Sequence, residues 1–192
     1  MESMLGISDA INRVLGKIAM AVGWLFLVAT IVIIFDVLSR KLGYQIPGMG
    51  STRLQELEWH LHTALFSFWI GVGYVRNTHV RIDVAVTGAK PRTQAWLEFI
   101  GCLIFAFPYT LIAIYFAWDF AATAFIDMEG SESANGLPYR WIPKGFILAG
   151  LVLLLLAVVS VFMRLIVFLY GPERLRAAAS YGGAKVEPQA AS

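Results

Sequence analysis

Long apolar stretches without formal charge alternate with clusters of charged residues along the chain. Asp, Glu, Lys and Arg are absent from residues 18–35, 99–118 and 145–163. Each stretch is close to the ~20 residues with which an α-helix crosses a hydrocarbon core of ~30 Å. The pattern therefore predicts helices that span a membrane.

A fourth, shorter apolar stretch at 65–75 follows a helical pattern of leucines. From Leu54 to Leu65, leucine recurs every three or four residues, which is typical of an amphipathic helix. We expect residues 52–62 to form a helix along the membrane interface that runs into this span.

The predicted fold class is an all-α membrane protein with four transmembrane helices and an amphipathic interfacial helix before the second span. Pro108 lies inside the third span and predicts a kink. Residues 1–170 form a single transmembrane domain in this prediction. Residues 171–192 are rich in Ala, Gly and Ser and predict a disordered tail after a short helical stub. The four predicted spans are 18–37, 59–75, 95–118 and 142–170.

Composition narrows the possible functions. The chain has 192 residues, of which 58% are hydrophobic and 15% are charged, whereas an average soluble domain has ~25% charged residues. A chain this short that lies mostly in lipid has no room for a soluble catalytic domain of about 100 residues, so we predict that it is not an enzyme. It has no phosphate-binding Gly-Lys-Ser/Thr motif and no basic stripe that indicates nucleic-acid binding. Its single cysteine, Cys102, cannot form an internal disulfide.

The distribution of Lys and Arg predicts the orientation in the membrane. With four spans, ten of the fifteen Lys and Arg residues lie on the side of the two termini, and five lie on the other side. By the positive-inside rule, both termini face the cytoplasm, and the loops at 43–53 and 119–141 face outward.

Two glutamates and two histidines near the second span are candidates for a metal site. Glu56 and His60 share one face of a helix. Glu58 and His62 share nearly the opposite face, so the four side chains cannot converge on a metal ion. A haem or quinone anchor needs histidines at matching depth on facing helices. All three histidines of this chain lie at or beyond the two ends of one predicted span. We predict no metal and no cofactor, and interpret Glu56, Glu58, Trp59 and His60 as candidates for a partner interface.

The connection after the second span has a different pattern. His79, Arg81 and Asp83 alternate with Val80 and Ile82, the period of two that is typical of an extended segment with one polar side. We interpret the three polar residues as further interface candidates. A solvated loop whose charges only enforce orientation is the alternative.

The middle of each predicted span lacks charge. Asp36 lies near the end of the first span and one turn before Arg40, so an i, i+4 ion pair is expected. Glu98 and Asp119 bracket the third span rather than occupy its middle. This pattern favours a helical scaffold or partner subunit over a self-sufficient transporter.

Several residues suit contacts with lipid or with other helices. Tryptophans near helix ends predict anchors at the head groups, and a lone arginine near the end of the fourth span can extend to them. Two pairs of small residues one turn apart, Ala19 with Gly23 and Gly145 with Ala149, permit close helix contact. The predicted lipid anchors are Trp24, Trp96, Trp118, Trp141 and Arg164.

Three motifs in order carry a resemblance to a known family. They are Gln55–His62, Gly71–Tyr74 and His79–Asp83. Over about residues 15–170, the chain resembles the small membrane subunit of tripartite ATP-independent periplasmic (TRAP) transporters, the DctQ-like family. Later motifs are similar to the branch assigned to mannitol, chloroaromatic or 2-oxo acid substrates. These are Pro91-Arg92, Glu129–Ser131, Gly136–Trp141 and Lys144.

The resemblance implies a three-part complex in the bacterial inner membrane. A periplasmic binding protein delivers an organic acid to the outer face, and a large sodium-coupled permease carries it by an elevator-like movement. The small subunit is a non-catalytic scaffold beside the permease. Two alternatives are a self-contained four-helix exporter that works as a dimer, which needs a carboxylate in mid-helix, and a membrane anchor for a redox enzyme.

Overall fold

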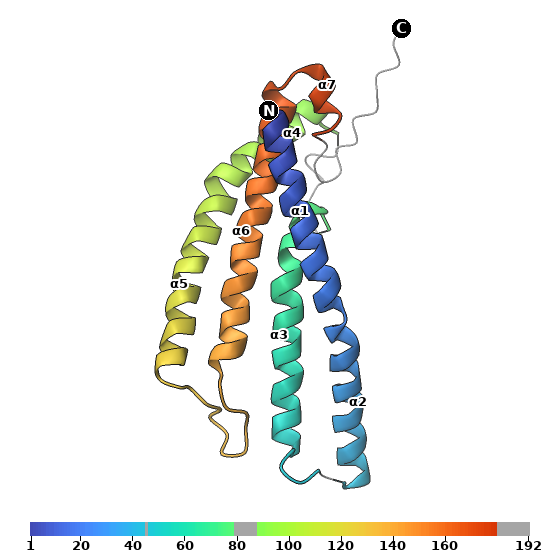
Figure 1. The fold of residues 1–192 in the computed structure, drawn as a ribbon, viewed down its shortest axis with the longest axis vertical. Coiled ribbons are helices and arrows are strands. Elements are labelled where there is room, and N and C mark those ends of the chain that lie inside the picture. The colour runs from blue at the N-terminus through green and yellow to red at the C-terminus, as the bar shows by residue number, and fades with distance from the viewer. Residues whose placement is uncertain (45, 79–87, 180–192) are drawn as a thin grey trace. The chain divides into compact units, whose positions relative to one another are not determined.

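The computed structural model describes residues 1–44, 46–78 and 88–179. The regular elements within these ranges are all helices, which confirms the predicted all-α class. The interface candidates His79, Arg81 and Asp83 lie outside the described residues, as do residues 180–192 of the predicted tail. The helices, drawn in Figure 1, are α1 (Glu2–Gly23), α2 (Leu25–Leu42), α3 (Ser51–Val75), α4 (Pro91–Gly101), the π-helix η2 (Cys102–Ala106), α5 (Phe107–Ile126), α6 (Trp141–Tyr170) and α7 (Glu173–Arg176).

The structure divides into two compact units. The first unit draws on residues 1–17, 70–112 and the part of the chain that begins at 153. The second unit draws on residues 18–69 and 113–152. The helices α1, α3, α5 and α6 contribute residues to both, so each unit contains its own set of helix contacts.

Three helical stretches of the described chain are long and apolar enough to cross a membrane. They are residues 2–42, 91–126 and 141–170. The helix α3 is not among them. Its first eight residues include Arg53, Glu56 and Glu58, and two histidines, His60 and His62, follow. The predicted interfacial helix at 52–62 and the predicted span at 59–75 are parts of this one uninterrupted helix.

The first stretch contains a joint at Trp24, inside the predicted span at 18–37. The Trp24 amide donates to the Ala21 carbonyl three residues back, at 3.4 Å, instead of continuing the α-helical pattern. Its backbone stays in the helical region, with φ −65° and ψ −24°, so the joint is local. The helix α2 ends at Leu42, because the next residue, Gly43, adopts a left-handed φ of 68°, a conformation that favours glycine.

The kink expected at Pro108 takes the form of a π-helical turn. Proline has no amide hydrogen, and its ring crowds the carbonyl one turn earlier. The chain widens just before it, since the Phe107 amide donates to the Cys102 carbonyl five residues back. Through η2 the predicted helix at 95–118 becomes a longer stretch, 91–126, with Pro91 at its start.

The core of the first unit is built from apolar side chains of α4, η2 and α6. Leu165 and Val167 of α6 and Cys102 of η2 are almost fully buried. Aromatic rings surround them, and Phe99 stacks on Phe162 with ring centroids 4.9 Å apart. Trp96, a predicted lipid anchor, packs edge-on against Phe99 and remains 37% exposed.

Two glycines bring the backbones of α3 and α6 into direct contact. In the second unit, a Cβ atom at Gly150 would lie 2.7 Å from the carbonyl carbon of Ser67. In the first unit, a Cβ atom at Gly71 would lie 2.9 Å from the carbonyl oxygen of Leu153. At Gly145, where the sequence permits close helix contact, a Cβ atom would meet nothing within 4 Å in the described chain. The close contact on α6 is therefore one and a half turns further along the helix.

We predict opposite effects for alanine at the two glycines of α6. Gly150→Ala forces α3 and α6 apart and should lower the free energy of unfolding by about 1–3 kcal/mol, as overpacking does. Gly145→Ala, the matched control, should leave it unchanged or raise it by up to about 1 kcal/mol, because alanine favours the helix. Unfolding of the detergent-solubilised chain measures both. Equal stability of the two variants would contradict the contact.

Candidate functional site

The carboxylate of Glu56 links α3 to a distant loop in the second unit. Glu56 lies in the second turn of α3 and is only 8% exposed. Its Oε1 atom accepts a hydrogen bond from the Ser131 hydroxyl, and its Oε2 atom accepts one from the Leu137 amide. We call Glu56, Ser131 and Leu137 the Glu56 clamp. It ties the loop between α5 and α6 to the start of α3.

The loop folds tightly around this carboxylate. The Ser131 amide donates to the Leu137 carbonyl at 3.1 Å, which closes the loop. A Cβ atom at Gly136 would overlap the Ser131 side chain and lie 2.7 Å from Oε2 of Glu56, so a larger residue at this position would disturb the clamp. Arg53 of α3 adds a second link, because its Nε atom donates to the Asn135 carbonyl at 3.2 Å.

The surroundings of Glu56 favour its charged form. Burial raises the pKa of Glu56, but hydrogen bonds from Leu137 and Ser131 and the positive charges of Arg140 and His60 outweigh burial. The net result is a pKa below the usual value of 4.5. The clamp is therefore fully ionised at neutral pH.

The predicted interface residues Trp59 and His60 lie beside the clamp. The Trp59 ring is 41% exposed and lies against the His60 ring, with centroids 4.2 Å apart. The guanidinium of Arg140 lies over the same Trp59 ring, at 5.9 Å from its centroid. His60 itself bonds through Nδ1 to the Glu56 carbonyl. These contacts leave Trp59 as the most exposed of the interface candidates that the structure describes.

A small cavity of about 230 Å³ opens next to Trp59. Lys144 lies at its wall, where its Nζ atom forms an ion pair with Glu129 and lies 3.9 Å from the centroid of the Phe120 ring. Glu129 pairs with Lys144, and Glu132 pairs with Arg140 at 3.4 Å, so both basic groups of the lining have a carboxylate partner. The lining residues are Trp59, Thr63, Phe120, Arg140, Pro143, Lys144 and Ile147.

The remaining candidate of the second unit, Glu58, faces a second carboxylate. Asp36 of α2 is fully buried, accepts a hydrogen bond from the Ser51 hydroxyl at 3.1 Å and forms the expected ion pair with Arg40 at 2.6 Å. Burial and the charge of Asp36 raise the pKa of Glu58, against the opposite effects of Arg40 and His62. This cluster joins the end of α2 to the start of α3.

The glutamates and histidines do not form a metal centre. His62 bonds through Nδ1 to the Glu58 carbonyl at 2.8 Å, one turn earlier on the same helix. Within the described ranges, His, Cys, Asp and Glu side chains form no group of three or more that could hold a metal ion.

The predicted lipid anchors have different surroundings. Trp24 and Trp118 are about two-thirds exposed, at 69% and 66%, whereas Trp141 is partly buried and packs against Phe125. The sequence predicts a lone arginine at Arg164. In the structure its side chain is only 14% exposed and pairs with Asp9 of α1.

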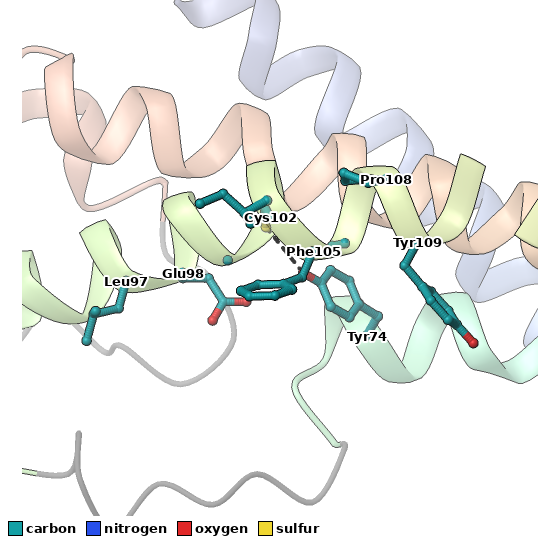
Figure 2. Close-up of a pocket in the computed structure, with 10 residues that line it drawn as sticks. Tyr74, Leu97, Glu98, Cys102, Phe105, Pro108 and Tyr109 are labelled. Carbon is teal, nitrogen blue, oxygen red and sulfur yellow. Dashed lines mark hydrogen bonds between the residues drawn. The ribbon is translucent and has the colours of Figure 1, made fainter. Parts of the chain in front are cut away.

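A separate groove in the first unit lies along η2. It has a volume of about 530 Å³ and is mainly apolar. Figure 2 shows Phe105 between Glu98 and Tyr74, and the Tyr74 hydroxyl directed at the sulfur of Cys102, 3.3 Å away. The π-helical turn places these side chains along one groove.

Comparison with known proteins identifies the family. The family described as tripartite ATP-independent periplasmic transporters, DctQ component, matches residues 29–168. The chain belongs to this family. The matched range includes the whole Glu56 clamp, and the family is that of the small component of a TRAP transporter rather than an enzyme family. The predicted substrate branch has no support from this match. Comparisons with curated proteins and with solved structures gave no match.

The sequence did not predict the hydrogen-bond partners of Glu56. Ser131 lies 75 positions from Glu56, and no periodicity relates the two residues. The available signal was indirect: the Glu129–Ser131 and Gly136–Trp141 motifs carry part of the resemblance, and both contribute to the loop that Glu56 holds.

We predict that Glu56→Gln loosens the loop between α5 and α6. A neutral amide cannot accept hydrogen bonds at both oxygens, so one donor, Ser131 or Leu137, loses its partner. The cost should be about 1–3 kcal/mol, seen as faster amide hydrogen exchange at Leu137. Asp127→Asn is the matched control, because Asp127 is exposed at the start of the same loop. Equal exchange in the two variants would show that Glu56 does not hold the loop.

The low pKa of Glu56 also predicts acid sensitivity. The folded chain holds Glu56 ionised more strongly than the unfolded chain, so the clamp contributes its full stability above pH 4.5 and loses it as the pH falls through the lowered pKa. The protection factor of the Leu137 amide should drop over that acidic range in the wild type. Glu56→Gln should remove this drop, and an unchanged drop would assign it to another group.

Proposed function

We propose that the chain is the non-catalytic small permease subunit of a TRAP transporter. It pairs with a large sodium-coupled permease subunit, and a periplasmic binding protein delivers an organic acid to the outer face of the pair. The proposal rests mainly on the family match, which covers residues 29–168. In this proposal the chain lies in the bacterial inner membrane with both termini in the cytoplasm.

The distribution of charge supports a scaffold rather than a carrier. The uncharged stretches at 18–35, 99–118 and 145–163 lie within the three candidate spans. Asp36 follows the first stretch, and its charge is already balanced by Arg40. A chain that carries a sodium ion or an organic acid by itself needs polar groups at mid-membrane. A self-contained exporter, the alternative function, has the same requirement.

In this proposal the predicted span at 59–75, within α3, crosses the membrane beside the three candidate spans. The whole helix of 25 residues extends ~37 Å, which exceeds a hydrocarbon core of ~30 Å. The contacts of α3 with α6 at Gly71 and Gly150 bring it against one of the candidate spans. Close packing through small residues is how helices associate in lipid. The Glu56 clamp then lies at the outer end of α3, where the binding protein docks.

We predict that the loop of the Glu56 clamp is outside the cytoplasm. Cys102→Ala removes the only native thiol, and Ser133→Cys adds an exposed one in the loop. A membrane-impermeant maleimide should label this variant in intact cells with a permeable outer membrane. A matched Ser3→Cys variant should be labelled only after lysis. The reverse pattern would overturn the orientation.

We also predict that transport requires the large subunit. Liposomes that contain this chain alone should take up no organic acid above empty vesicles when a sodium gradient and the binding protein are supplied. Liposomes that contain both membrane subunits should accumulate it. Gradient-dependent uptake by this chain alone would rule out the scaffold assignment.

A further inference from the structure

A second charged cavity, in the first unit, is left unexplained by the scaffold function. It has a volume of about 660 Å³ and is lined by residues of α1, α3 and α6. The lining residues are Asp9, Asn12, Arg13, Leu15, Val72, Val75, Arg76 and Arg164.

The lining has an excess of positive charge. Arg164 is held in place, because its Nη2 atom pairs with Asp9 and its Nε atom donates to the Ser8 hydroxyl at 2.8 Å. Among the described lining residues, Asp9 is the one carboxylate, against three guanidinium groups. Two positive charges of this described lining therefore have no carboxylate to balance them.

The two remaining arginines are free to bind a ligand. Arg13 donates only to the Asp9 carbonyl, at a long distance of 3.4 Å, and its side chain is exposed. Arg76 is also exposed and makes no side-chain hydrogen bond or ion pair with the part of the chain that the structure describes. A guanidinium group binds phosphate oxygens in a bidentate manner, which makes these two arginines suited to a phosphate group.

The rest of the lining is apolar, and it is ordered along the helices. On α1, Arg13 precedes Leu15, which is almost fully buried. On α3, Val72 and Val75 precede Arg76, which follows the end of that helix. The charged groups therefore lie toward the start of α1 and the end of α3, and the apolar groups lie toward the interior of both helices. A ligand with an anionic head and an apolar tail matches this order.

We propose that this cavity binds the head group of an anionic phospholipid, with Arg13 and Arg76 on the phosphate and an acyl chain along Leu15, Val72 and Val75. The assignment to the cytoplasmic leaflet rests on the proposed function and its orientation. Basic pockets between membrane helices on the cytoplasmic side bind anionic head groups in this way. An acidic segment of a protein partner would use the arginines and leave the apolar wall unused.

The test measures lipid binding to the purified full chain in neutral detergent by native mass spectrometry. Phosphatidylglycerol and phosphatidylcholine with identical acyl chains are the two probes. We expect phosphatidylglycerol to bind about tenfold more tightly, and Arg13→Gln with Arg76→Gln to remove this preference. Arg92→Gln with Arg174→Gln is the control with the same loss of charge, because both arginines are exposed and lie outside the cavity.

A second variant tests the apolar wall without a change of charge. Val72→Trp fills the inner part of the cavity and should weaken binding of phosphatidylglycerol while the arginines remain. Circular dichroism shows whether each variant keeps its helices. If a variant unfolds, Arg76→Gln alone replaces it and should lower the preference for phosphatidylglycerol several-fold.

Three results would overturn the proposal. The first is equal binding of the two lipids to the wild type, and the second is an unchanged preference in the cavity variants. The third is full displacement of phosphatidylglycerol by millimolar inorganic phosphate, which would indicate a site for free anions. The assay contains no large subunit and no transported substrate. A failure here therefore leaves the scaffold function intact, and a failure of the transport test leaves this result intact.

Discussion

The direct contact between the backbones of α3 and α6 is the constraint on which the other features depend. At Gly150 the Ser67 backbone occupies the space of a side chain, and at Gly71 the Leu153 carbonyl does so. In lipid, where apolar side chains gain little by meeting one another, such close approach is a main source of helix association. The contact gives α3, which is not itself among the three candidate spans, a partner among them.

The charged side chains of α3 and its neighbours serve the ends of the helices. Glu56 holds the loop between α5 and α6, and Asp36 joins the end of α2 to Ser51 at the start of α3. Arg164 joins α6 to α1 through Asp9. Each of these groups is paired within its own unit, which is consistent with a frame that holds its shape and does not pass ions along its length.

Local sequence patterns predicted those features that depend on neighbours in the chain. The uncharged run of α6 and the i, i+4 pair of Asp36 and Arg40 follow from helical periodicity, and both are present. Contacts between distant segments were not predictable, because many glycines and serines are equivalent in a single sequence. The sequence therefore did not indicate the contact at Gly150 or the link from Glu56 to Ser131.

The depth of α3 in the membrane decides whether this helix is a transmembrane span. Phe66 lies near the middle of the proposed span, and its side chain is 64% exposed on the helix surface. A spin label at Phe66→Cys in a Cys102→Ala chain, reconstituted into bilayers, reports this depth through its accessibility to oxygen and to a water-soluble nickel complex. We expect high oxygen and low nickel accessibility, with the opposite ratio for a label at Gln55→Cys. High nickel accessibility at position 66 would contradict a fourth span held against α6.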